Sequence, residues 1–290
     1  MDDTVWSGQG WFDEIDLDPA GHWRRLGTRQ LGDRPWLVVD GRRQAELSLK
    51  EQLSADRHGE VFAIESGAED GVLTAGRETL DLVDGVLVRL DLDGPTTGDG
   101  DLHPLDRAGR SVQEDLCLVR PGDGTWVLAA ASLCFPSRWR LDEKVGRSIT
   151  ATHGPVDGYD RHLASRVDRL FDHLGERIVL RRNWFVHPDP SLFQPDRPPN
   201  GDPLVEADRC LDDLHLRSER QTLRRLPVSG WILFTIRIQQ DPLRPFVVDD
   251  ERAAALRRYL DEAPVEQLAH RGLSPDQAER LRTAIADRAP

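Results

Sequence analysis

Cysteine is scarce in this sequence, and its spacing excludes the usual cysteine chemistry. Cys117, Cys134 and Cys210 are odd in number and lie far apart along the chain. They therefore form neither a disulfide framework nor a CxxC metal or redox pair. Free cysteines usually pack as small apolar side chains, so we expect three buried, reduced thiols.

Basic charge and long apolar runs are also lacking. The formal net charge is −13, which argues against a protein that mainly neutralises nucleic-acid phosphates. No apolar run approaches the roughly 20 residues of a membrane span, and the N-terminal residues lack the basic and apolar regions of a signal peptide. Apolar residues still make up 38% of the 290 residues, so we expect a folded, cytoplasmic protein.

The common catalytic motifs are missing too. The sequence has no glycine-rich dinucleotide fingerprint, no GxxxxGK[ST] loop, no GxSxG elbow and no HExxH helix. Its nine histidines have no spacing typical of zinc. Motifs of these kinds therefore do not indicate a nicotinamide, nucleotide-triphosphate, zinc or simple serine-hydrolase enzyme.

The first part of the chain is rich in tryptophan and poor in periodicity. Residues 6–43 carry four of the eight tryptophans without a clear repeat, which predicts an extended, wrapping segment. Apolar spacing predicts helices at 47–53 and 77–90. Residues 95–101 are rich in Pro, Thr, Gly and Asp and indicate a break.

Strand patterns dominate after this break. Apolar runs at 111–120 and 125–134 flank Pro-Gly-Asp-Gly, a strong hairpin signal because the Asp-Gly pair supplies left-handed turn geometry. Residues 176–186 alternate toward an aromatic end and predict a further strand. A second strand pair is predicted at 221–226 and 231–240, joined through Pro-Val-Ser-Gly.

Helical spacing returns before and after these strands. Residues 159–174 place their apolar side chains on one face, which predicts an amphipathic helix. The tail from residue 249 onward repeats at helical spacing. In this tail, Ser274 and Gln277 form a capping-box pattern.

The order of these patterns predicts an α+β chain. Hairpins without crossover helices indicate a central antiparallel sheet, and helices are expected at both ends. A length of 290 residues permits one large domain or two modest ones. We divide the chain into a wrapping segment with helices (1–100), a core (101–245) and a helical tail (246–290).

Several short blocks carry a resemblance to a known family. The central blocks are CFPSRW at 134–139, EKVGR at 143–147 and HGPV at 153–156. Further blocks are HPL at 103–105, QEDL at 113–116, RNW at 182–184, LRSERQTLRRLP at 216–227 and FTIR at 234–237. In this order, and over a stretch from about residue 24 to the C-terminal region, they resemble the haem-dependent oxidative N-demethylase family, formerly a domain of unknown function.

The resemblance implies both a fold and a reaction. It implies a PAS-like sheet that binds haem b within residues 101–245, and the removal of a methyl group from a small secondary or tertiary amine with dioxygen, as formaldehyde. The sequence has no flavin, nicotinamide or iron–sulfur signature, so a separate NAD(P)H-dependent flavin and iron–sulfur reductase must supply two electrons. The alternatives are a haem-binding PAS-like sensor or carrier, which the lack of an output domain weakens, and a scaffold that has lost haem.

The resemblance also suggests the axial ligand of the haem. An oxygen-activating haem needs one protein ligand and an open opposite face, and imidazole is the commonest such ligand. His153 in the HGPV block is the candidate, with His187 and His215 in reserve; the plainer interpretation of His153 is a histidine that bonds its own turn. A thiolate from Cys134 or Cys210 is a further alternative.

Basic and aromatic side chains of the matched blocks are candidates to hold the haem. Guanidinium groups are natural partners of the propionates, and the candidates are Arg138, Arg147, Arg182, Arg220 and Arg224. Trp139 and Trp184 could wall the haem or the amine pocket. The alternatives are a solvated strand face for the arginines and ordinary core packing for the tryptophans.

A protonated amine needs an acidic or aromatic host. Glu219, Asp115 and Trp184 are the candidates for contact with the substrate. Because Glu219 lies among arginines in the run 217–220, an internal ion pair is the alternative interpretation of its carboxylate.

Overall fold

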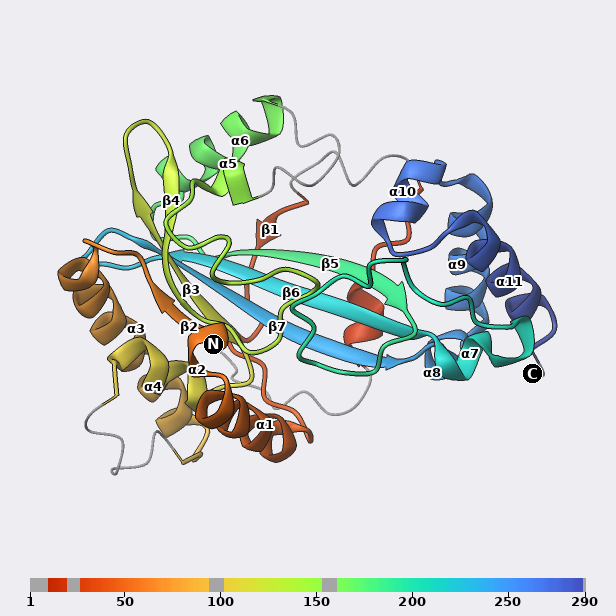
Figure 1. The fold of residues 1–290 in the computed structure, drawn as a ribbon, viewed down its shortest axis with the longest axis horizontal. Coiled ribbons are helices and arrows are strands. Elements are labelled where there is room, and N and C mark those ends of the chain that lie inside the picture. The colour runs from red at the N-terminus through yellow and green to blue at the C-terminus, as the bar shows by residue number, and fades with distance from the viewer. Residues whose placement is uncertain (1–9, 20–26, 94–101, 153–160, 289–290) are drawn as a thin grey trace.

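A seven-stranded antiparallel sheet forms the centre of the computed structural model, which describes residues 10–19, 27–93, 102–152 and 161–288 (Figure 1). The strand order is β1-β5-β6-β7-β3-β4-β2. The strands are β1 (Arg29–Gln30), β2 (Phe62–Ile64), β3 (Asp115–Pro121), β4 (Trp126–Ser132), β5 (Val179–His187), β6 (His215–Arg225) and β7 (Ile232–Pro242). Every pairing is antiparallel, which confirms the predicted mixed fold with an antiparallel sheet.

Both predicted hairpins are present. The β3–β4 turn closes with a hydrogen bond from the Gly122 amide to the Thr125 carbonyl, at 2.8 Å, and Gly124 has a φ of 71°. The β6–β7 turn contains Gly230 with a φ of 72°. Glycine adopts this left-handed conformation without a steric penalty, which explains why these turns could be predicted.

Strand β6 extends well beyond its prediction. The sequence predicted residues 221–226, but the strand begins at His215 and pairs with β5 on one side and β7 on the other. Its first half contains the charged side chains of Arg217, Glu219 and Arg220, all of which are buried. Charged residues of this kind hide the apolar alternation from which strands are predicted.

Helices form the remaining layers. They are η1 (Gly10–Glu14), α1 (Arg43–Asp56), α2 (His58–Val61), α3 (Glu69–Arg89), α4 (Pro104–Ser111), α5 (Ile149–Thr152), α6 (Arg161–Asp172), η3 (Ala207–Arg209), α7 (Cys210–Asp213), α8 (Leu243–Val247), α9 (Asp250–Glu262), α10 (Val265–His270) and α11 (Pro275–Ala286). The helices predicted at 47–53, 77–90 and 159–174 correspond to α1, α3 and α6. Among the described residues, none of the helices is long and apolar enough to cross a membrane.

Helix α4 corrects the predicted start of the first strand. The prediction placed residue 111 in a strand, but Ser111 ends α4 and β3 begins only at Asp115. Pro104 occupies the first turn, and the side chain of His103 accepts a hydrogen bond from the Leu105 amide at 3.2 Å. These are ordinary helix-start signals. The prediction missed them because they directly follow the turn-rich break at 95–101.

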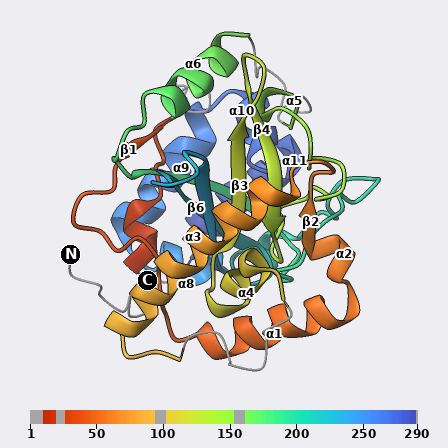
Figure 2. The same ribbon diagram turned by 90° about the vertical axis from the view of Figure 1, so that its left-hand side faces the viewer.

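The two faces of the sheet are covered by different helices. We name them by the helix above each: the α3 face carries Arg182, Ser218 and Arg220, and the α6 face carries Arg181 and Glu219, because neighbouring strand residues point to opposite sides. Figure 1 shows α1, α3 and α4 below the sheet and α5 and α6 above it. Figure 2 shows α3 crossing in front of the strands, with α6 and α1 at opposite ends of the view.

Helices α7–α11 gather at one end of the long strands (Figure 1). They bury an apolar cluster that includes Trp184, Phe246 and Tyr259. Helices α9–α11 confirm the helical tail predicted from residue 249 onward. The side chain of Ser274 caps α11 by accepting from the Gln277 amide at 3.1 Å. The side-chain amide of Gln277 bonds the backbone of Val205 instead, so only half of the predicted capping box forms.

Candidate functional site

The α6 face carries a linked row of polar side chains on the neighbouring strands β5 and β6. Arg181 lies opposite Gln221 in the β5–β6 ladder. Its guanidinium donates to Gln221 Oε1 at 3.1 Å, and Gln221 Nε2 donates to Glu219 Oε2 at 2.9 Å. Glu219 is 8% exposed. This chain of hydrogen bonds fixes the orientation of the Glu219 carboxylate on the sheet.

Apolar side chains that are only partly buried surround this row. They pack against the core cluster of the α6 face yet remain half-exposed, and they are Trp139, Val145, Ile149, Val167, Leu170, Leu223 and Phe234. They come from the loop after β4, from α5 and α6, and from the β6–β7 hairpin. A partly exposed apolar surface with a few oriented polar groups is the usual composition of a ligand site. We call this part of the α6 face the candidate site.

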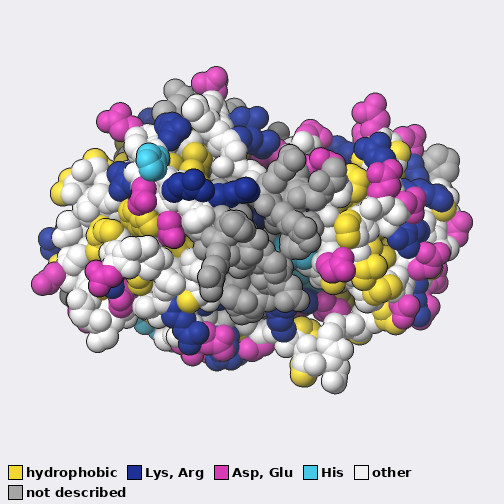
Figure 3. All heavy atoms as spheres, turned by 90° about the horizontal axis from the view of Figure 1, so that it is seen from above, with side chains coloured by type: hydrophobic (Ala, Val, Ile, Leu, Met, Phe, Trp, Pro, Cys, Tyr) yellow, Lys and Arg dark blue, Asp and Glu magenta, His cyan; other side chains and the backbone are white. Residues whose placement is uncertain are grey.

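A lysine lies over an aromatic ring in the candidate site. The ammonium of Lys144 is 4.5 Å from the ring centroid of Trp139. Burial lowers the pKa of Lys144, and the charge of Glu219 opposes this effect. Figure 3 looks onto this side of the molecule from above and shows Lys and Arg side chains among the acidic ones on either side of its middle.

Neutral imidazoles lie along the same face. His270 on α10 has its ring centroid 6.2 Å from that of Phe185, and its pKa is lowered to about 4 by burial and then by Arg271. His187 is 3% exposed, and neither of its ring nitrogens has a hydrogen-bond partner among the described residues. Burial, followed by the charge of Arg138, lowers its pKa to about 4. Uncharged imidazoles of this kind are suited to bind iron.

His215 lies directly opposite His187 on β6. Its Nδ1 atom is buried and has no partner in the part of the chain that the structure describes, and burial lowers the pKa of His215. The two histidines held in reserve as iron ligands are therefore brought together. His153, the first candidate, lies outside the described residues.

Arg217 holds the loops beside the candidate site. It is fully buried and is hydrogen-bonded to the two loops that follow β4 and β5. The acceptors are the carbonyls of Phe135, Pro136, Ser191 and Leu192 and the side chains of Ser137 and Gln240, at 3.0–3.2 Å. Burial lowers the pKa of Arg217 to about 10. A single guanidinium thus ties two loops to the sheet.

Asp115 anchors the start of the loop after β4. Its two oxygens accept the amides of Cys134 and Phe135, at 2.8 and 2.9 Å, and Lys50 forms an ion pair with it at 3.3 Å. Lys50 and Asp115 are both buried. These internal contacts use both oxygens of Asp115, and contact with an amine remains a prediction.

Four of the predicted side chains point to the opposite side of the sheet. Trp184, Arg182, Arg220 and Arg224 lie on the α3 face and so are not brought together with Glu219. Arg182 donates to Glu14 Oε2 at 2.8 Å, and Trp184 donates its indole N–H to the Asp16 carbonyl at 2.9 Å. Both contacts attach the N-terminal segment to the sheet.

The other two arginines of this group contact the segment around Trp36. Arg220 is buried and donates to the carbonyls of Pro35 and Trp36. The guanidinium of Arg224 lies 4.6 Å from the ring centroid of Trp36. These positions favour a structural role, and contact with a propionate remains a prediction.

The remaining predicted residues lie in the loop after β4. Arg138 forms a bidentate ion pair with Asp202, with both distances at 2.6 Å. Arg147 is exposed, and Trp139 lies in the candidate site. The structure therefore brings together Trp139 and Glu219 from the predicted set and adds Arg181, Gln221 and Lys144, which sequence reasoning missed.

The cysteines are free and buried, as predicted. Burial raises the pKa of Cys134 to about 12 and that of Cys210 to about 11. Both thiols are therefore protonated at neutral pH, which gives no support to a thiolate ligand.

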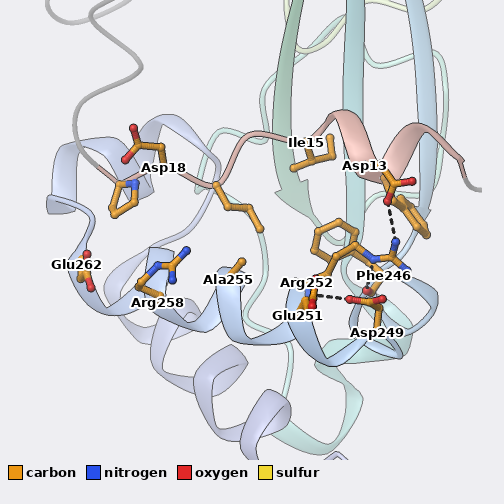
Figure 4. Close-up of a pocket in the computed structure, with 13 residues that line it drawn as sticks. Asp13, Ile15, Asp18, Phe246, Asp249, Glu251, Arg252, Ala255, Arg258 and Glu262 are labelled. Atoms are coloured by element: carbon orange, nitrogen blue, oxygen red, sulfur yellow. Dashed lines mark hydrogen bonds and ion pairs between the residues drawn. The ribbon is translucent and has the colours of Figure 1, made fainter.

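A groove of about 690 Å³ lies elsewhere, between η1 and α9 (Figure 4). The described residues that line it include no histidine, cysteine, methionine or tyrosine to bind iron. Among these residues, Asp13, Asp18, Asp249, Glu251 and Glu262 outnumber the two arginines, and carboxylates repel haem propionates. Arg252 is already paired with Asp13 at 3.0 Å. The described residues of this groove therefore do not fit a haem.

Comparison with known families agrees with the resemblance. The family model described as haem-dependent oxidative N-demethylase, alpha subunit-like, matches residues 88–279, about two thirds of the chain. This region contains the candidate site and most of the sheet, including β3 to β7. The chain belongs to the family of haem-dependent oxidative N-demethylase alpha subunit-like proteins.

Proposed function

We propose that this protein binds haem b at the candidate site and is the catalytic subunit of a monooxygenase that demethylates a small secondary or tertiary amine. The observation that carries the proposal is the combination, on the α6 face, of a half-exposed apolar surface, uncharged imidazoles and the oriented carboxylate of Glu219. Family membership supplies the class of reaction.

The topology supports a PAS-like core. Strands β5-β6-β7-β3-β4 are consecutive in the sheet, and α5 and α6 lie in the connection between β4 and β5. In our proposal the cofactor lies between this helical connection and the α6 face of the sheet. We therefore keep the division into 1–100, a haem-binding core at 101–245 and a tail at 246–290.

The residues of the candidate site suggest how the haem is held. Trp139, Leu223 and Phe234 provide apolar contact, and Arg181 provides a cation for a propionate. The axial ligand is a histidine: His153 in the HGPV block, or one of His187 and His270. When bound, the haem supplies oxygen activation.

Glu219 is suited to bind the amine. Gln221 and Arg181 hold its carboxylate in one orientation, and a fixed carboxylate at a partly dry site pairs strongly with a protonated amine. The Trp139 ring adds a cation–π surface. In the overall reaction the amine, dioxygen, two electrons and two protons give the demethylated amine, formaldehyde and water.

The electrons come from another polypeptide in this proposal. The sequence contains no flavin, nicotinamide or iron–sulfur signature. The alpha subunit-like description of the family indicates partner subunits. We propose a separate flavin and iron–sulfur reductase that uses NADH or NADPH.

A second candidate function is a haem-binding sensor or carrier without catalysis. The observation that favours it is the neighbouring pair of His187 and His215, in which both ring nitrogens of His187 and Nδ1 of His215 are buried without a partner among the described residues. If one of these histidines and a histidine from another segment filled both axial positions, dioxygen would have no open coordination site.

The ultraviolet–visible spectrum tests both functions. The protein is expressed with a haem precursor, and its spectrum is recorded oxidised, reduced, and reduced with carbon monoxide. A Soret band that shifts with carbon monoxide supports the enzyme, and a band that does not respond supports the sensor or carrier. Absence of haem uptake by a folded protein would overturn both.

Single variants then identify the axial ligand. We expect one of His153→Ala, His187→Ala and His270→Ala to lose most of the haem while its circular dichroism stays unchanged. His173→Ala, at an exposed position just after α6, is the matched control and should retain the wild-type spectrum. Full haem content in all three variants would contradict the assignment of the axial ligand to one of these histidines.

A further inference from the structure

The Lys144 side chain is in an unusual position for an ammonium group. Its stem comes from the loop after β4, and its head group lies over the Trp139 ring at 4.5 Å. Among the described residues, none accepts a hydrogen bond from the ammonium or forms an ion pair with it. The carboxylate whose charge most favours this ammonium is that of Glu219. In the described part of the chain, this cation therefore has an aromatic face against it and the attraction of the Glu219 charge, but no direct ion-pair partner.

These two features suit an alkylated ammonium better than a lysine. A lysine head group has three N–H donors and is strongly hydrated, but no described residue accepts a hydrogen bond from the Lys144 head group where it lies. A methylated ammonium has fewer N–H groups, and its methyl groups pack favourably on an aromatic face. The chemistry of the subsite therefore matches a small N-methylated ammonium more closely than the side chain that fills it.

Glu219 has capacity for such a ligand. Only its Oε2 atom accepts a hydrogen bond from a described residue, the one from Gln221 at 2.9 Å. The Arg181–Gln221 pair holds the carboxylate in place from the other side. Oε1 therefore remains for the N–H of a bound amine.

We propose that Trp139 and Glu219 form an ammonium subsite that the side chain of Lys144 fills from within the chain, and that a small N-methylated ammonium binds by displacing it. The choice of an amine rests on the proposed function, whereas the subsite and its internal competitor come from the contacts of Lys144. Its four-carbon stem is flexible, so the head group can leave while the loop stays in place. Lys144 then acts as an internal competitor that weakens amine binding by the fraction of time it fills the subsite.

Direct binding of an inert probe tests the proposal. Tetramethylammonium has no N–H and cannot be demethylated as an amine, and dimethylammonium has two N–H groups. The dissociation constants of both are measured by calorimetry or ligand-observed NMR. We expect Lys144→Met, which keeps an unbranched side chain without the charge, to bind both about tenfold more tightly than the wild type. Lys144→Arg keeps the cation and should show no gain.

Three further variants separate the subsite from a general charge effect. Arg140→Met removes an exposed cation four residues away and should change the affinity less than twofold. In the Lys144→Met background, Trp139→Leu should weaken tetramethylammonium binding about tenfold. Glu219→Gln in the same background should weaken dimethylammonium more than tetramethylammonium, because only the former has an N–H for Oε1.

The outcomes distinguish this inference from the proposed function. The internal competitor is disproved if Lys144→Met binds neither probe more tightly than the wild type does. It is also disproved if the gain in affinity is no larger than that of Arg140→Met, even where haem content is normal. If haem is not taken up but the probe affinities change as expected, the proposed function fails while the ammonium subsite stands. The Soret band and the probe affinities are measured on the same samples.

Discussion

Buried arginines in this protein are stabilised in two different ways. Arg237 on β7 has carboxylate partners, Asp40 Oδ2 at 2.7 Å and Glu46 Oε2 at 2.8 Å. Arg217 on β6 is equally buried, yet its hydrogen-bond partners are neutral oxygens. Because carbonyls at fixed positions bind a guanidinium, they determine the path of the loops that carry them. The first arrangement attaches α1 to the sheet, and the second shapes the rim of the candidate site.

Arg217→Met tests the second arrangement. The substitution leaves a group of buried carbonyls, including those of Phe135 and Leu192, without a donor. We expect the free energy of unfolding to fall by about 3 kcal/mol, because unsatisfied buried polar groups are costly. Urea unfolding at pH 7 measures this.

Arg209→Met is the matched control for this experiment. Arg209 is also paired, with Asp213 at 2.9 Å, but its side chain is 63% exposed. Exposed pairs contribute less than about 1 kcal/mol. Equal losses in the two variants would contradict the role assigned to the buried guanidinium.

Strand alternation decides which predicted site residues can meet. The matched block at 216–227 made Glu219, Arg220 and Arg224 appear as one set. In β6, odd-numbered residues face α6 and even-numbered residues face α3. Glu219 and Arg220 therefore lie on opposite faces. Applied to the sequence, the same rule would have grouped Glu219 with Gln221 and, once the register was known, with Arg181.

Local signals account for the elements that were predicted correctly. The Asp-Gly turn and the spacing of the tail helices are encoded within a few residues. The early part of β6 and the position of Lys144 depend on contacts between distant segments. Arg217, for example, donates hydrogen bonds to carbonyls about 80 residues away, and no pattern within a short window contains that information. The register of β5 against β6, which brings Arg181 to Gln221, is a property of the whole sheet.

Helix α4 packs so closely on the sheet that it requires a glycine. A Cβ atom on Gly109 would lie 2.2 Å from Ser132 Oγ on β4. We expect Gly109→Ala to lower the free energy of unfolding by about 2 kcal/mol, because overpacking in a core usually costs about 1–3 kcal/mol. Thermal unfolding followed by circular dichroism measures the change.

Gly85→Ala gives the opposite expectation at another helical glycine. Its Cβ would meet only the end of Arg89, at 3.7 Å. Alanine is favoured over glycine inside helices by about 0.5–1 kcal/mol, so this variant should gain stability. A stabilised Gly109→Ala would show that α4 can move away from β4.

The whole molecule is organised around the two longest strands. Strands β6 and β7 pass from the clusters beside α3 and α6 to the cluster beneath α9–α11. Leu216 belongs to the end cluster and Leu233 to the cluster beside α3. Loss of packing in the end cluster therefore weakens the β6–β7 pairing on which the other two clusters also depend. The stability of the candidate site thus depends on the entire sheet.

The free energy of unfolding should fall in mild acid, because burial makes protonation of the His187 and His270 imidazoles unfavourable in the folded state. The pKa values of His187 and His270 are lowered to about 4, against about 6.5 in the unfolded chain. Between these values the unfolded state binds more protons, so the free energy of unfolding decreases as the pH falls from about 6.5 to 4. Glu14, whose pKa is lowered overall because its arginine neighbours outweigh burial, adds a loss below about pH 4.5.

Urea unfolding of the haem-free protein at a series of pH values measures this dependence. We expect a loss of about 1–2 kcal/mol per histidine between pH 7 and pH 5. His187→Leu removes one titrating group from the interior, so its stability should depend less steeply on pH than that of the wild type. His173→Leu changes an exposed histidine and should keep the wild-type slope. An unchanged slope in His187→Leu would mean that this imidazole is hydrated in the folded protein, and it would then no longer be a candidate for a dry, neutral iron ligand.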